Sequence, residues 1–178
     1  MLGIASRRLG FICASVGLIG LISLAPQCAR ASDDVQLCDN SINDPDEGIP
    51  ACTRIINGPQ ISKPESVFNN RGNAWFRKGV YPSAIDDYSA AIERNPRFVE
   101  AFRNRAFVLI NQNEFDRAIS DLNQALILDP KSSFAFYLRG FALSNKGEFE
   151  RAIRDFDAAI ALKGDYYAAY LHRGDAWY

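Results

Sequence analysis

The sequence has little of the residues on which metal binding and nucleophilic catalysis usually depend. It contains four cysteines and a single histidine, His172, near the end of the chain. These residues are too few and too far apart for a thiol–imidazole pair or a metal site, and no glycine-rich phosphate loop follows a strand pattern. We therefore expect neither an enzyme nor a bound metal or cofactor.

The sequence also lacks a strong charge of one sign and a long apolar run. The formal net charge is −1, which gives no reason to expect a nucleic-acid partner. Arg7 and Arg8 precede an apolar run from Phe11 to about Ala25, and Ala29-Arg30-Ala31 follows as a small-x-small cleavage signal. The run is too short for a membrane span. We predict a signal peptide over residues 1–31, cleaved after Ala31 rather than retained as an anchor, and a periplasmic or secreted product without a membrane span.

Cleavage would leave two cysteines, Cys38 and Cys52. In an oxidising compartment the expected state of such a pair is a disulfide, and two unpaired thiols are the alternative if the chain is not exported. The surrounding residues 32–64 are rich in Asp, Asn, Pro and Gly. We predict a loop-rich, disulfide-clipped cap segment with one short helix over Asp46–Ile56.

From Glu65 onward, small and large residues recur with a period of 34. Counting Glu65 as position 1, the small residues are Gly72, Ala106, Gly140 and Gly174 at position 8, Ala84, Ala118 and Ala152 at position 20, and Ala91, Ala125 and Ala159 at position 27. Large apolar residues repeat at positions 4, 11, 17 and 24. Such a period predicts stacked helix pairs, in which small residues let backbones approach and large ones fill the spaces between.

Glycine and proline set the expected helix ends. The first helix of the first unit should run from Pro64 to about Lys78, and the second helices from Pro82 to about Arg94, Asp116 to about Leu128, and Glu150 to about Leu162. Gly79, Asn113 and Gly147 should end the first helices in a left-handed conformation.

These units resemble tetratricopeptide repeats, with family-type residues at positions 4, 8, 11, 17, 20, 24, 27 and 32. The resemblance implies an all-α fold, an α-solenoid of antiparallel helix pairs. Its units are 65–98, 99–132, 133–166 and a partial unit, 167–178, which supplies one further helix. A leader, a two-cysteine segment and such repeats together are similar to small exported repeat proteins of Gram-negative bacteria.

One regularity departs from the common repeat pattern. Position 7 is arginine in every unit (Arg71, Arg105, Arg139, Arg173), and position 23 is aspartate in each full unit (Asp87, Asp121, Asp155). Because the two positions lie on facing helices, we predict Arg–Asp bridges within or between units. An arginine row for an anionic ligand is the alternative.

The resemblance also implies a groove lined by the first helix of each unit, where a protein or peptide partner binds. Its residues here are Asn70, Asn73, Phe76, Arg77, Arg103, Asn104, Phe107, Ile110, Asn111, Tyr137, Phe141 and Asn145. The family's clamp for a C-terminal carboxylate is only half present: Asn73 and Asn104 match its amide positions, but Asn69, Phe134 and Leu138 stand where basic residues are needed. Phe134 and Tyr137 could equally pack against the cap or another repeat.

We therefore predict a non-catalytic binding scaffold. The alternative is a structural component of an envelope assembly that forms a homodimer through its partial fourth unit. The exposed apolar face there would consist of Tyr167, Tyr170, Trp177 and Tyr178.

Overall fold

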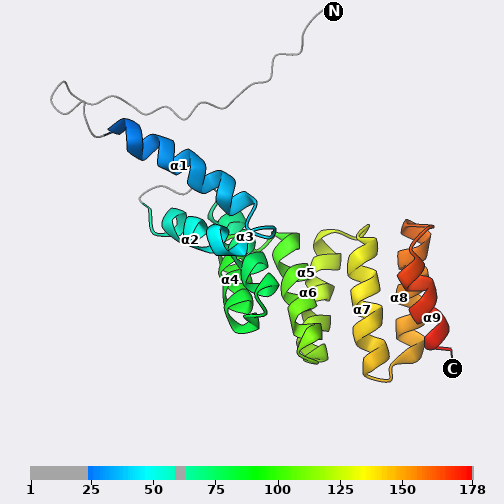
Figure 1. The fold of residues 1–178 in the computed structure, drawn as a ribbon. Helices are drawn as coiled ribbons and strands as arrows, with labels where there is room; N and C mark the ends of the chain where they lie inside the picture. The colour runs from blue at the N-terminus through cyan, green and yellow to red at the C-terminus, as the bar shows by residue number, and fades with distance from the viewer. Residues whose placement is uncertain (1–23, 59–62, 178) are drawn as a thin grey trace, which may run out of the picture.

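The computed structural model describes residues 24–58 and 63–177, and all regular structure in these ranges is helical (Figure 1). The predicted leader falls largely on residues 1–23, outside the described ranges. The helices are α1 (Leu24–Asp39), α2 (Pro45–Ile56), α3 (Pro64–Arg77), α4 (Tyr81–Arg94), α5 (Val99–Asn111), α6 (Phe115–Leu128), α7 (Ser133–Asn145), α8 (Phe149–Leu162) and α9 (Tyr167–Asp175). None of them is long and apolar enough to cross a membrane.

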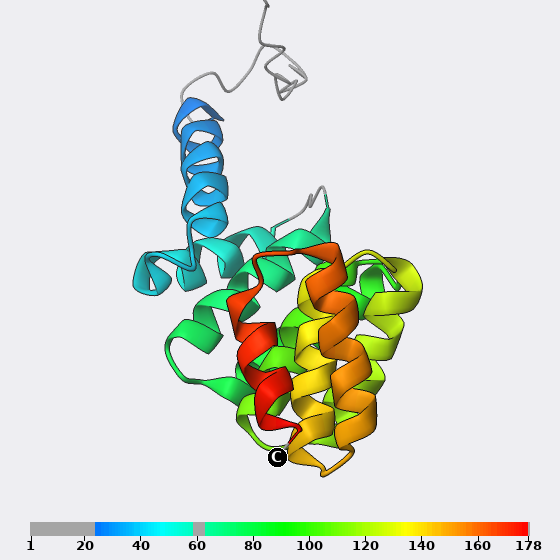
Figure 2. The ribbon, with the colours of Figure 1, turned by 90° about the vertical axis from the view of Figure 1, so that its right-hand side faces the viewer.

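From α3 onward the helices form the predicted antiparallel pairs, and each pair packs on the next (Figures 1 and 2). The predicted boundaries are confirmed to within a residue. Gly79 (φ +74°), Asn113 (φ +60°) and Gly147 (φ +79°) adopt the left-handed conformation that reverses the chain after α3, α5 and α7.

The first helices of the units form one face of the stack. Helix α3 contacts α5, and α5 contacts α7, whereas α4, α6 and α8 make no comparable contacts with one another. The stack is therefore closer together on the side of α3, α5 and α7, and this face carries the candidate functional residues.

The small residues lie at the close contacts, as predicted. The six alanines at positions 20 and 27 have no exposed surface. A Cβ placed on Gly72 would lie 2.7 Å from Cε1 of Tyr88, and one on Gly140 would lie 2.9 Å from Cε1 of Phe156. An aromatic ring of the second helix thus packs directly on the backbone of the first, which leaves no room for a side chain.

We expect Gly140→Leu to lower the free energy of unfolding by about 3 kcal/mol, because the added side chain meets both the Phe156 ring and the carbonyl oxygen of Ala152, 3.1 Å from the added Cβ. Thermal denaturation followed by circular dichroism measures the change. Gly174→Leu is the matched control at the same repeat position, where no neighbouring atom lies within 4 Å. Equal melting temperatures for the wild type and Gly140→Leu would contradict the packing described here.

The cap segment is more regular than the sequence indicated. Helix α2 was predicted, but the expectation of a loop-rich segment is wrong for residues 32–39, which belong to α1. Asp44 caps α2 by accepting a hydrogen bond from the backbone N–H of Glu47, and Pro45 occupies the first turn. A disulfide joins Cys38 of α1 to Cys52 of α2.

Helices α1 and α2 form a helical hairpin, which we call the cap hairpin. It packs on the first repeat through buried and polar contacts. Cys38, Ala51 and Cys52 are buried together, with Val67 of α3 packed against them. The Ser41 hydroxyl donates to the carbonyl oxygen of Asn70 (2.8 Å). The hairpin therefore covers the outer side of α3, as the next repeat covers α4.

Candidate functional site

The position-7 arginines of the three full units are bound in bridges and are not available to a ligand. In each full unit, Nε and Nη2 of the arginine donate to the two carboxylate oxygens of the aspartate sixteen residues later, at 2.7 to 2.8 Å. The pairs are Arg71–Asp87, Arg105–Asp121 and Arg139–Asp155. The predicted bridges are thus confirmed and lie within units. Because each arginine faces its own carboxylate, its charge is neutralised.

The remaining guanidinium nitrogen of each arginine, Nη1, joins neighbouring units. Nη1 donates to a polar side chain on the preceding second helix, at 2.6 to 2.9 Å. These acceptors are Thr53, Ser89, Asn123 and Asp157, for Arg71, Arg105, Arg139 and Arg173 respectively. We call the whole set the arginine ladder. It runs from the cap hairpin to α9.

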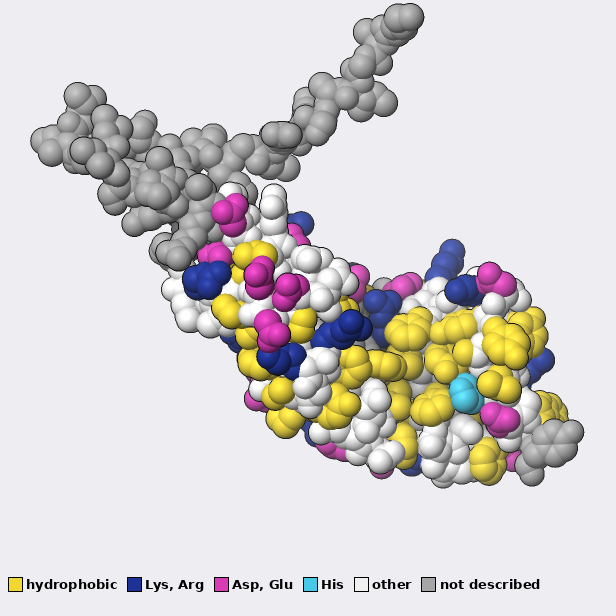
Figure 3. Space-filling view, in the orientation of Figure 1, with side chains coloured by type: hydrophobic (Ala, Val, Ile, Leu, Met, Phe, Trp, Pro, Cys, Tyr) yellow, Lys and Arg dark blue, Asp and Glu magenta, His cyan; other side chains and the backbone are white. Residues whose placement is uncertain are grey.

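A continuous series of aromatic rings crosses the face formed by α3, α5 and α7. Neighbouring ring centroids lie 5.4 to 6.5 Å apart, a spacing at which aromatic side chains attract one another. We call this series the aromatic row, and it consists of Phe76, Phe107, Phe134, Tyr137 and Phe141. Figure 3 shows hydrophobic side chains gathered on this side of the molecule, over α5, α7 and α9.

Three asparagine amides lie beside the row, at the α3–α5 junction. Nδ2 of Asn104 donates to Oδ1 of Asn69 (3.0 Å) and to Oδ1 of Asn73 (3.2 Å). The Tyr88 hydroxyl donates to the same Oδ1 of Asn73 (2.8 Å), and burial raises the pKa of this phenol, which therefore stays protonated. The amides are thus fixed in one orientation before any ligand arrives.

Two arginines on this face have no carboxylate partner among the described residues. Arg77 is exposed at the end of α3. The Arg103 guanidinium stacks over the Phe134 ring, 5.6 Å from its centroid, and its Nε is buried without a hydrogen-bond acceptor. Arg103 is therefore a positive group set in aromatic surroundings and left unpaired.

The side chains of four predicted groove residues are buried or already hydrogen-bonded within the protein. Ile110 is buried, with 7% of its surface exposed. Nδ2 of Asn70 donates to Asp39 of the cap hairpin (3.0 Å). Nδ2 of Asn111 and Nδ2 of Asn145 donate to the carbonyl oxygens of Phe107 and Phe141 on their own helices. These side chains contribute shape, while the amides of Asn73 and Asn104 remain beside the aromatic row.

Two further rings, which the repeat pattern did not identify, pack at the end of the aromatic row. The Tyr137 ring lies 5.0 Å from that of Tyr166 and 5.9 Å from that of His172, which also packs edge-on against Phe141. Burial raises the pKa of Tyr137 and that of Tyr166, the latter to about 12. His172 is therefore part of an aromatic cluster, and a search for ring spacing between units could have found it.

The described residues do not assemble the carboxylate clamp of the resemblance. Asn69 is buried and hydrogen-bonded to Asn104, Leu138 is 2% exposed, and Phe134 belongs to the aromatic row. Within residues 24–58 and 63–177 no group of three or more His, Cys, Asp or Glu side chains could hold a metal ion.

The stacked helix pairs and the side chains on one face define a helical repeat protein of the solenoid class. Comparison with protein families identifies the repeats: residues 69–133 and, overlapping them, 122–154 match tetratricopeptide repeat families. Residues 69–154 of this chain are therefore tetratricopeptide repeats.

Solved structures similar to this chain share its fold. The first such domain of Spaghetti (RPAP3), bound to an HSP90 peptide, is 26% identical, with a TM-score of 0.64 over 67% of this chain and 96% of that one. The second such domain of human RPAP3, in complex with an HSP70 peptide, is 28% identical, with a TM-score of 0.61 over 62% and 92%. MamA, at 19% identity and a TM-score of 0.74 over 84% and 82%, shows the fold alone. No curated protein matches.

Proposed function

We propose that this protein is an exported, non-catalytic scaffold that binds a protein or peptide partner across the face of α3, α5 and α7. The observation that carries the proposal is the unpaired Arg103 beside the aromatic row. Its surroundings favour a segment with an apolar or aromatic side chain next to a carboxylate, because the rings supply contact area and the arginine supplies a charged hydrogen-bond donor.

Two observations support this proposal. The RPAP3 domains, at 26% and 28% identity, hold peptides, so this fold accommodates such ligands. The fixed amides of Asn73 and Asn104 lie beside the row, where they can exchange hydrogen bonds with a peptide backbone at little cost in side-chain ordering.

Export is supported by the leader pattern and by the disulfide between Cys38 and Cys52, because disulfides persist in oxidising compartments. Cleavage after Ala31 would leave Ser32–Asp39 of α1, and the disulfide would still tie this remnant to α2.

The test is a pull-down from a periplasmic extract. The bait is the protein purified from the periplasm, and mass spectrometry should show an N-terminus at Ser32. The wild type is compared with Arg103→Glu/Phe107→Ala. We expect the variant to lose a set of partners and to bind the segment mapped by cross-linking at least about tenfold more weakly, because it lacks a charged and an aromatic contact.

The matched control is Arg97→Glu/Ile127→Ala, which makes the same kind of changes at an exposed arginine and at an isoleucine that is 72% exposed on α6. It should bind like the wild type. Capture of the same partners by all three proteins would contradict a site on the face of α3, α5 and α7.

A further inference from the structure

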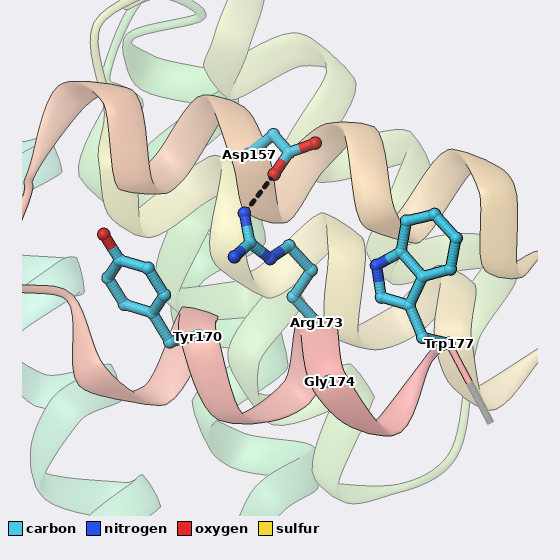
Figure 4. A pocket seen from close by; sticks show the side chains of 5 residues that line it. All are labelled: Asp157, Tyr170, Arg173, Gly174 and Trp177. Carbon is cyan, nitrogen blue, oxygen red and sulfur yellow. Dashed lines mark hydrogen bonds and ion pairs between the residues drawn. The ribbon is translucent and has the colours of Figure 1, made fainter.

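Helix α2 of the cap hairpin corresponds to the second helix of a repeat. In the full units, the side chain at position 25 accepts a hydrogen bond from Nη1 of the next arginine, as Asp157 does from Arg173 at 2.6 Å (Figure 4). Thr53 of α2 accepts the same kind of bond from Arg71 (2.9 Å) and therefore corresponds to position 25. The residue before it, Cys52, corresponds to position 24.

Position 24 holds the central buried side chain of each full unit. Tyr88, Leu122 and Phe156 occupy it, and none of them is more than 1% exposed. The rings of Tyr88 and Phe156 pack on the glycine of the facing helix. In the cap hairpin, Cys52 reaches the facing helix through its disulfide with Cys38. The disulfide thus takes the place of a large apolar side chain.

The core of the cap hairpin contains little besides this disulfide. Among the described residues of the hairpin, the largest fully buried side chains are those of Cys38, Cys52 and Ser41. Position 23, which is aspartate in the full units, corresponds to Ala51, so the hairpin cannot form their Arg–Asp bridge. An ion pair between Arg54 and Asp34 joins α2 to α1, but the Arg54 side chain is 48% exposed, and exposed pairs contribute little.

The hairpin holds α3 through residues close to Cys38. The Ser41 hydroxyl donates to the backbone carbonyl oxygen of Asn70, and Asp39 accepts from Nδ2 of the same asparagine. Val67 of α3 packs on the buried cysteines. Because Asp39 and Ser41 lie within three residues of Cys38, their position on α3 depends on the disulfide.

We propose that the disulfide between Cys38 and Cys52 is a redox switch that controls docking of the cap hairpin on α3. Oxidation of the two thiols by a disulfide oxidant removes two electrons and two protons and forms the S–S bond, while the oxidant is reduced to two thiols. A dithiol reductant reverses this exchange. The oxidised hairpin is docked. The reduced hairpin lacks a core of its own and separates from α3, whereas the later helices keep their buried side chains.

Docking also protects the bond. Cys38 and Cys52 are 1% and 0% exposed, so an attacking thiolate reaches the sulfur atoms only when the hairpin opens. Because α3 carries Asn73 and Phe76, opening of the hairpin would loosen one side of the candidate site. That effect on the site rests on the proposed function, whereas docking of the hairpin does not.

The test compares the oxidised protein with the protein reduced by dithiothreitol, in which mass spectrometry should show a gain of two hydrogen atoms. We expect reduction to speed hydrogen exchange of the backbone amides of α1 and α2 at least about a hundredfold, because the disulfide no longer closes the loop between them. Exchange should rise in the first turn of α3 and change little in α5 to α8. Re-oxidation with glutathione disulfide should restore the protection.

Thiol modification provides a second measurement. In the reduced protein, iodoacetamide should modify Cys38 and Cys52 as fast as it does in the urea-unfolded chain, because both thiols become accessible. Cys38→Ala/Cys52→Ala lacks the bond without any reductant and should lose the same amide protection. Arg54→Ala is the control: it removes the exposed ion pair but keeps the disulfide, and its hairpin should remain docked in the oxidised protein.

Protected thiols and amides in the reduced hairpin would overturn the proposal. Loss of protection throughout α5 to α8 on reduction would also overturn it, because the disulfide would then support the whole fold rather than one hairpin. The partner-binding proposal is tested with the disulfide intact and with substitutions on α5, so the two proposals fail independently.

Discussion

Asp121→Ala is expected to lower the free energy of unfolding by about 3 kcal/mol, because it leaves the Arg105 guanidinium without its carboxylate in a half-buried position. Both oxygens of Asp121 accept hydrogen bonds from Arg105, and the two side chains are only 9% and 20% exposed. Ser89 would remain as the single polar partner of the arginine. Chemical denaturation of the wild type and the variant measures the difference.

A double-mutant cycle with Arg105→Ala separates the bridge from other effects of the substitution. We expect a coupling energy above about 1.5 kcal/mol, because charge-assisted bidentate pairs are stronger than neutral hydrogen bonds. The exposed pair Arg117–Glu114 is the control and should couple by less than about 1 kcal/mol. Additive single effects at Arg105 and Asp121 would show that the bridge does not stabilise the fold.

The second large effect is expected for Phe156→Ala, at about 4 kcal/mol. The Phe156 side chain is fully buried, and it packs on Gly140 and stacks with the His172 ring at 6.3 Å. Its removal leaves a cavity between α7, α8 and α9 that the glycine cannot fill. Because each repeat is stabilised only by its neighbours, the loss should be concentrated at this end of the stack.

Hydrogen exchange of backbone amides locates this effect. Protection should fall in α8 and α9 and change little in α3 and α4. Phe149→Ala on the same helix is the matched control: its ring is 46% exposed, and its removal should cost less than about 1.5 kcal/mol. A similar loss of stability for both variants would argue against a specific role of the Phe156 contact.

The repeats could be predicted from sequence because their physical requirements return at a fixed period. A glycine recurs at position 8 where a ring packs on the backbone, and an arginine recurs wherever an aspartate faces it. Each such residue solves the same packing problem in each unit. The hydrogen bond donated by Nη1 of the arginine was not predictable, because any small polar side chain can accept it. The acceptors are a threonine, a serine, an asparagine and an aspartate.

The cap hairpin was harder to predict because its composition favours turns locally. Its helices are stabilised by contacts distant in sequence, such as those between Arg54 and Asp34, and by the disulfide between Cys38 and Cys52. Such tertiary contacts override local propensity.

The candidate site was predicted in outline, as a helix face, but not in detail. Exposure decides which side chains can reach a ligand, and exposure depends on neighbouring helices. Ile110 lies on the predicted stripe and is nevertheless buried, whereas His172 lay outside the prediction and packs at the end of the aromatic row.

The arginine ladder also sets a rule for how such a chain can grow by gene duplication. Each rung of a full unit needs an arginine, an aspartate sixteen residues after it and a polar acceptor on the preceding helix, which lies sixteen residues before Arg105 and Arg139 and eighteen residues before Arg71. Duplication of one whole 34-residue unit, such as Glu65–Phe98, adds one complete rung and leaves the others in register. A segment one residue shorter would turn the new arginine away from both partners, so the ladder restricts viable insertions to whole repeats.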